Sequence, residues 1–205
     1  MVADVPAIRM LKEAAPRTGT IERDEFAAIL RHLPTFAQPA AQFAYECGWR
    51  IQSEILPMEW HQVDLQHGIV HLPGGITKTG KARDLHLWPP LQRLLEQQRA
   101  LTDRLQREQK KVIPLVFHHD GERISRFDRL WKSATTAAGV PWTIPHDMRR
   151  SAARNLVRDG LTEGVAMAIT GHLTRSVFDD YNVTKERDLV NAAKQLGSTR
   201  MASAG

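Results

Sequence analysis

The sequence predicts an α+β fold that is mainly α-helical and contains a small antiparallel β-sheet. Three observations support this prediction. Most segments repeat apolar residues three and four positions apart, which is the spacing of a helix that buries one face. Two short runs, 69–72 and 83–87, instead alternate apolar and polar residues as strands do. The 205 residues, of which 42% are hydrophobic, suit a single globular domain.

The predicted domain spans residues 20–196, between a flexible lead-in at 1–19 and a disordered tail at 197–205. The lead-in contains two prolines and shows little periodicity, which is typical of a chain end that is not packed. A helix over about 22–32 opens the domain, and a second helix follows Pro39.

The two predicted strands are expected to pair, because the glycine-rich segment 73–81 between them is suited to a hairpin. Pro89 then begins a long amphipathic helix, since proline is favoured in the first helical turn. The apolar run 115–117 is a candidate for one more short strand.

Four further helices are expected in the C-terminal part of the chain. One carries the apolar positions of 127–134 and ends at Gly139, and the next begins at Pro145. Gly171 ends a third helix as a left-handed cap. The last helix covers about 184–196 and has one apolar face.

Composition and charge narrow the classes of function. The formal net charge of +5 and the sequence pI of about 9.7 favour a polyanionic partner. Cys47 is the only cysteine, which excludes an intramolecular disulfide and a thiolate zinc cluster. None of the nine histidines shows the i, i+4 pairing with a glutamate that zincins use, so no metal site is expected. The chain has no apolar run of membrane-spanning length and no signal-peptide pattern, so a cytoplasmic location is expected.

One arginine of the helix that follows Pro145 is predicted to face inward. Met148, Ala152 and Leu156 fall on one arc of this helix, and Arg149 lies in the middle of that arc. A guanidinium cannot be deprotonated and is costly to bury without a negative partner. A separate i, i+4, i+8 stripe can face water or a polyanion, and it is formed by Arg150, Arg154 and Arg158.

Arg149 alone is compatible with a structural role, in which it pairs with a buried carboxylate while His146 helps to cap the helix. The residues downstream favour chemistry instead. Gly171 leaves His172 on the loop after its helix, and Tyr181 follows nine residues later. Cations for a phosphate, imidazoles for its oxygens and a phenol as nucleophile together indicate a phosphoryl-transfer site.

The order His146-x-x-Arg149, Gly171-His172, Tyr181 resembles the C-terminal signature of the tyrosine recombinases, the phage-integrase family of site-specific DNA recombinases. The resemblance covers about residues 20–196 and implies the catalytic domain of that family. Members usually carry a further N-terminal helical domain, which residues 1–19 are too short to form.

A second motif, which begins Gly48-Trp49-Arg50 and includes Glu54, resembles the first-arginine motif of the same family. Arg50 matches the first catalytic arginine. Glu54 follows it by four residues, whereas the family pattern has three. An exposed Arg50–Glu54 pair on one helix, worth a few tenths of a kcal/mol, is the alternative interpretation.

The resemblance assigns roles to the two arginines and to both histidines. Arg50 and Arg149 would clamp the two non-bridging oxygens of a DNA phosphodiester, because guanidinium forks fit that geometry. His172 would donate to the same oxygens, and His146 would assist in deprotonating the nucleophile.

The remaining catalytic roles fall to a tyrosine and a lysine. Tyr181 would attack the phosphorus and form a 3′-phosphotyrosyl link, with Tyr45 as a weak rival that is expected to pack in the core. Lys78, in Thr-Lys-Thr-Gly, would protonate the leaving 5′ oxygen, and Lys81 is the reserve choice. One ester replaces another at each step, so neither a metal nor another cofactor is needed.

The partners that the resemblance implies are double-stranded DNA and other recombinase protomers, which the 184–196 helix would contact on DNA. Two other classes remain open, a type IB topoisomerase and a DNA-binding remnant without catalysis. We expect DNA contacts from six basic residues, which are Lys81, Arg83, Arg150, Arg154, Arg158 and Arg175.

Overall fold

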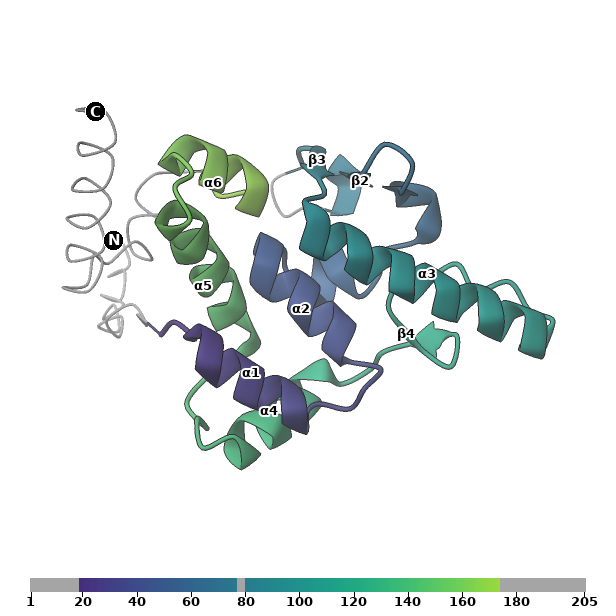
Figure 1. Ribbon diagram of the computed structural model, residues 1–205, viewed down its shortest axis with the longest axis horizontal. Coiled ribbons are helices and arrows are strands. Elements are labelled where there is room, and N and C mark those ends of the chain that lie inside the picture. The colour runs from purple at the N-terminus through teal and green to yellow at the C-terminus, as the bar shows by residue number, and fades with distance from the viewer. Residues whose placement is uncertain (1–18, 77–79, 174–205) are drawn as a thin grey trace, which may run out of the picture.

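A computed structural model describes residues 19–76 and 80–173 of the chain. Within these ranges, the chain forms α-helices and two small antiparallel sheets (Figure 1). The predicted 184–196 helix, and the candidate residues Lys78, Arg175 and Tyr181, lie outside the described residues. In the described part of the chain, no helix has the length and hydropathy that crossing a membrane requires.

Five helices surround the core of the domain. α1 packs against α4, α2 against α5, and α5 against α6 (Figure 1). The Glu25 carboxylate accepts from the Glu22 backbone N–H at 2.8 Å and so caps the start of α1. The helices span Arg23–His32 (α1), Gln38–Cys47 (α2), Phe127–Ala137 (α4), Pro145–Arg158 (α5) and Glu163–Thr170 (α6).

The predicted pair of strands is confirmed. β2 (Ile69–Leu72) lies between β1 (Val63–Asp64) and β3 (Arg83–His86), and both pairings are antiparallel. A second sheet consists of β4 (His118–His119) and β5 (Glu122–Arg123).

The predicted strand at 115–117 is wrong. Leu115 forms one isolated bridge with Glu59, and the backbone N–H of Val116 donates to the Met58 carbonyl at 2.9 Å. Val116 and Phe117 are buried in a connection that bends before β4, and an apolar run by itself cannot distinguish such a connection from a strand.

α3 (Pro89–Gln109) begins at the predicted proline and extends beyond the rest of the domain (Figure 1). Its first half is part of the core, because Leu91 and Leu95 are fully buried. Further along, Leu101 and Leu105 are only half-buried, because the helix leaves the core before it ends.

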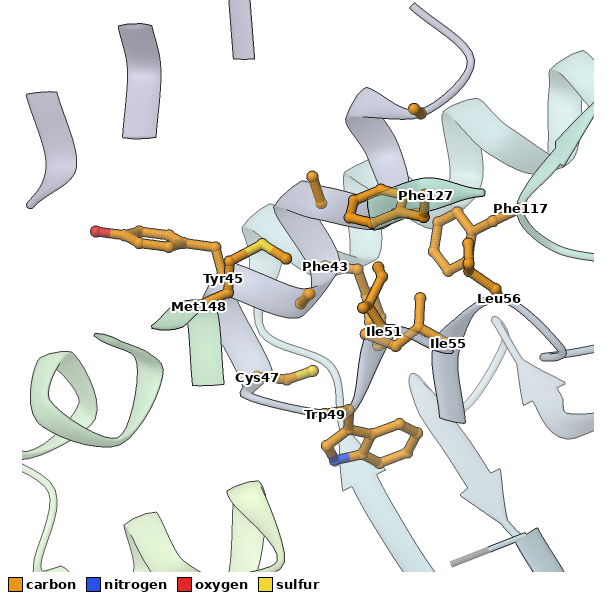
Figure 2. Close-up of a cluster of buried hydrophobic side chains, with 14 of the residues drawn as sticks. Phe43, Tyr45, Cys47, Trp49, Ile51, Ile55, Leu56, Phe117, Phe127 and Met148 are labelled. Atoms are coloured by element: carbon orange, nitrogen blue, oxygen red, sulfur yellow. The ribbon is translucent and has the colours of Figure 1, made fainter. Parts of the chain in front are cut away.

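The core consists of large side chains from α2, α4 and the segments beside them. Figure 2 shows Phe43, Phe117 and Phe127 close together, and all three are buried. Burying a side chain of this size stabilises the fold by roughly 1.5–3 kcal/mol. Trp49 is also buried, beyond the end of α2, so the core reaches the segment that carries Arg50.

α2 ends at Gly48, whose backbone is left-handed with φ +72°. A Cβ at this position would lie 2.8 Å from the Thr170 side chain and 3.0 Å from that of Ala152. Gly48 therefore brings the ends of α2 and α6 close to the middle of α5, and this approach positions the candidate site.

Candidate active site

Five structural elements meet at the candidate site. They are the C-terminal ends of α2 and α6, the N-terminal half of α5, the start of β3 and a π-helical turn at Ile51–Ile55. The sequence-predicted residues Arg50, His146, Arg149 and His172 all lie on these elements or directly beside them.

Arg149 points inward, as predicted, and its partners include three carbonyl oxygens. Its Nη1 donates to the Gly48 carbonyl at 2.7 Å and also to the Thr170 carbonyl. Its Nη2 donates to the Gly171 carbonyl at 3.1 Å. These carbonyls are at the C-terminal ends of α2 and α6, where the helix dipole is negative. The buried guanidinium is therefore stabilised by the ends of two helices.

Arg50 is held by Glu54 across the π-helical turn. The Glu54 carboxylate, 0% exposed, accepts from the Arg50 backbone N–H at 2.7 Å and from its Nη1 at 2.9 Å. The turn contains an i→i+5 bond, from the Leu56 N–H to the Ile51 carbonyl at 2.9 Å. This wider turn accommodates the additional residue between Arg50 and Glu54, so the exposed helix pair is wrong as an alternative.

Arg83, which was predicted to contact DNA, joins the same network. Its Nη2 lies 2.9 Å from a Glu54 oxygen, and its Nη1 donates to the Thr170 carbonyl at 3.1 Å. The side chain is only 13% exposed. Arg83 and Leu85 are two residues apart on β3, so both point to the buried face of the sheet.

The two histidines of the site have strongly lowered pKa values. Withdrawal of the His172 ring from water, and the positive charges of Arg149 and Arg50, lower its pKa to about 3. Burial of the His146 ring lowers its pKa to about 4, and among the nearby positive charges that of Arg150 contributes most to this shift. Both imidazoles are therefore neutral at pH 7 in the free protein.

The hydroxyl of Thr170 holds the His172 ring in place. It lies 2.7 Å from Nδ1 of His172 and donates to the Ala166 carbonyl at 2.8 Å. The ring is therefore tied to the C-terminal end of α6.

A cleft of about 690 Å³ opens on the site, and its lining includes Arg50, His146 and Arg149. The exposed indole of Trp142 and the side chain of Lys132 also line it. The cleft therefore offers cationic and imidazole groups beside an apolar wall, which is an environment for an anionic ester.

The predicted exposed stripe of three arginines is wrong, because the segment before α1 covers it. Arg154 is 3% exposed and donates to the Glu22 carboxylate at 2.8 Å. Arg158 lies 3.5 Å from the same carboxylate, and Arg150 donates to Asp147 at 3.0 Å. Periodicity placed these side chains on one face, but it could not show that a segment some 130 residues earlier lies across it.

Two more predictions concern Lys81 and Tyr45. Lys81 is exposed at the surface, where a phosphate could reach it. Tyr45 is buried, as expected, and its hydroxyl donates to the Ile21 carbonyl at 3.0 Å. Burial raises the pKa of Tyr45, which is unfavourable for a nucleophile.

Sequence reasoning missed three contributors to the site. They are the link from Arg83 to Glu54, the Thr170 hydroxyl, and Trp49, whose Nε1 donates to the Ile169 carbonyl at 2.9 Å. The sequence held a signal for the link from Arg83 to Glu54. Arg83 is two residues before Leu85 in a predicted strand, so it belongs to the apolar face of that strand.

The chain belongs to the phage integrase family, because the model of that family matches residues 20–187. A curated relative is the shufflon-specific DNA recombinase of Escherichia coli, which is 27% identical over 143 residues. The alignment covers 68% of this chain and 33% of the relative, so the chain spans about a third of that protein's length. The resemblance found in the sequence is confirmed.

Solved structures show the same fold. XerA recombinase has a TM-score of 0.70 at 17% identity, with 92% of this chain and 66% of that chain covered. A lambda integrase dimer bound to a COC′ core site has a TM-score of 0.69 at 17% identity, covering 85% and 51%. The lambda integrase catalytic core has a TM-score of 0.61 at 17% identity, covering 75% and 91%. The predicted α+β class is confirmed as that of a tyrosine recombinase catalytic domain.

Proposed function

We propose that this chain is the catalytic domain of a site-specific DNA recombinase, which cleaves and rejoins strands through a 3′-phosphotyrosyl intermediate. The observation that carries the proposal is the cleft in which Arg50, Arg149 and His146 meet. Membership of the phage integrase family supports the same class of reaction.

The proposed step begins with a phosphodiester whose two non-bridging oxygens face Arg50 and Arg149. Two guanidinium groups offset the negative charge that would repel a nucleophile and that increases in the transition state. The neutral imidazole of His146 is suited to accept a proton, because a base must be unprotonated to act.

Tyr181 is the proposed nucleophile. Its oxygen bonds to phosphorus as its proton leaves, the bond from phosphorus to the 5′ oxygen breaks, and Lys78 protonates that oxygen. A free 5′-hydroxyl then attacks the phosphotyrosine, which restores a phosphodiester and releases the tyrosine. Each step exchanges one ester for another, so the reaction balances without a cofactor.

We further propose that the chain acts with other protomers on double-stranded DNA. A similar structure is a lambda integrase tetramer bound to a Holliday junction, with a TM-score of 0.67 at 18% identity. The 184–196 helix, whose predicted apolar face follows the nucleophile, is the segment that we propose docks on a neighbouring protomer.

A nicked DNA substrate tests the proposal, because the strand released by cleavage diffuses away and traps the covalent product. The wild-type chain should give a protein–DNA band on a denaturing gel, and Tyr181→Phe should not. Tyr45→Phe is the matched control, since it removes the other tyrosine hydroxyl of the chain and should leave the band. A band that persists in Tyr181→Phe, or that is lost in folded Tyr45→Phe, would contradict the assignment.

The alternative classes give different results in the same assay. A type IB topoisomerase would relax supercoiled DNA of any sequence, whereas a recombinase should act at particular sites. A non-catalytic remnant would bind DNA and give no band with any substrate.

A further inference from the structure

We propose that Arg83 is a positioning residue, which joins Glu54, the carboxylate that holds Arg50, to the turn that presents His172. This inference rests on the proposed function and extends it to a residue outside the catalytic set. Arg83 comes from β3, far in sequence from both of the segments that it connects.

The first half of the link is a carboxylate shared by two arginines. Glu54 is fully buried and accepts from Arg50 at 2.9 Å, and its other oxygen lies 2.9 Å from the Nη2 of Arg83. A carboxylate has two oxygens and accepts several hydrogen bonds, so it can hold both guanidinium groups at once. The position of Arg50 therefore depends on a carboxylate that Arg83 also holds.

The second half of the link is the C-terminal end of α6. The Nη1 of Arg83 donates to the Thr170 carbonyl at 3.1 Å, and Arg149 donates to the same oxygen. The Thr170 hydroxyl in turn lies 2.7 Å from the His172 ring. Arg83 thus contacts the residue that orients His172 and shares an acceptor with the second arginine of the cleft.

The surroundings of Arg83 leave its guanidinium little freedom. Its Cζ lies 5.1 Å from the centre of the Trp49 ring, within cation–π range. On the other side is Gly171, where an added Cβ would lie 1.2 Å from Nη1 of Arg83. Gly171 therefore supplies the left-handed backbone that ends α6 and also the space that the guanidinium occupies.

The geometry favours positioning over direct DNA contact. Arg50 and Arg149 line the cleft, whereas Arg83 is not among its lining residues, and its side chain is 13% exposed with a carboxylate as partner. Its planar fork pairs with a carboxylate and donates to a carbonyl on a different element, which a lysine ammonium cannot reproduce with the same geometry.

The test separates the rate of cleavage from the affinity for DNA, with the full chain. For Arg83→Met we expect single-turnover formation of the covalent product on nicked DNA to fall by about 10²-fold, because small displacements of catalytic groups have effects of this size. Its Kd for duplex DNA, and the salt dependence of that Kd, should stay within about twofold of wild type, since no phosphate contact is lost.

Two further variants calibrate this result. Arg83→Lys keeps the charge without the fork, and its rate should lie between those of Arg83→Met and wild type. Arg99→Met is the matched control, because Arg99 also lies 5.1 Å over an indole ring, that of Trp60, and pairs with Asp103, but it is on α3. This control should leave the rate unchanged.

Three outcomes would overturn the proposal. The first is a wild-type rate of cleavage in Arg83→Met. The second is full restoration of that rate in Arg83→Lys, since charge alone would then suffice. The third is a loss of affinity in Arg83→Met with a salt slope lower by about 0.9, which would identify a phosphate contact.

Hydrogen exchange in the free protein tests this inference separately from the proposed function. If the wild-type chain forms no covalent product, the proposed function is rejected, but the exchange measurement still decides whether Arg83 links the two segments. The amides of Gly171 and His172 donate to the Met167 carbonyl at 2.7 and 3.0 Å, and that of Glu54 donates to the Arg50 carbonyl at 2.9 Å. Arg83→Met should accelerate hydrogen exchange at both places, because each loses its tie to the other. Unchanged exchange at both would reject the link.

Discussion

The substitution Glu54→Gln tests how the centre of the site is held together. The glutamine has nearly the same shape as the glutamate, but only one of its two terminal atoms can accept a hydrogen bond. In the native protein both oxygens of the buried carboxylate are used: Oε1 accepts from the Nη1 of Arg50, and Oε2 accepts from the Arg50 backbone N–H and lies 2.9 Å from the Nη2 of Arg83. The amide nitrogen would therefore face a guanidinium, and neither positive charge would keep its carboxylate.

The expected loss of stability follows from burial. Removing one partner of a buried ion pair costs about 3–5 kcal/mol, and we take the lower limit, about 3 kcal/mol, because the Arg50 side chain can still reach water. At about 2–4 °C per kcal/mol for a chain of this size, the melting temperature should fall by about 6–12 °C.

The assay is urea denaturation followed by fluorescence, with thermal melting as a second measurement. Glu108→Gln is the matched control, because Glu108 also forms an i, i+4 pair with an arginine, Arg104, but both side chains are exposed. It should cost less than about 1 kcal/mol. If Glu54→Gln lowers the free energy of unfolding by no more than this control, the carboxylate does not hold the two arginines as described.

Three other predictions concern pH, proton donation and assembly. The folded pKa of His172 is about 3 and an unfolded histidine titrates near 6.5, so the unfolded chain binds more protons between these values. The free energy of unfolding should therefore decrease as the pH is lowered through this window, by up to about 1.4 kcal/mol per pH unit. His172→Asn should have a flatter pH dependence, and an unchanged slope would contradict the lowered pKa. Lys78→Ala should cleave a substrate with sulfur at the bridging 5′ position much better than the ordinary one, because a thiolate leaves without a proton; equal loss on both would move the role to Lys81 or elsewhere. Deleting 184–205 should spare cleavage of a single strand but impair assembly on paired sites, as measured by gel mobility, and unchanged assembly would exclude docking of this segment on a neighbour.

The sequence by itself determined the elements of the fold and the order of the motifs. Helices at Arg23–His32 and Pro145–Arg158, and the strands around the glycine-rich hairpin, follow from local periodicity and from proline and glycine at the expected places. The inward position of Arg149 followed as well, because its apolar neighbours on the helix define the buried face. The roles of Lys78 and Tyr181 remain predictions.

Only the tertiary structure decided which charged residues other than Arg149 are buried, and with what partners. Arg154 lies on a face that is polar by periodicity, yet Glu22, from a segment that α5 cannot specify, covers it. Glu54 follows Arg50 by one residue more than the family pattern has, and the wider π-helical turn still places its carboxylate against Arg50. Arg83 becomes part of the site because β3 and the end of α6 meet. In each case the partner is set by packing between distant segments or by the path of the backbone, whereas the local sequence pattern reports only the direction in which a side chain leaves its own element.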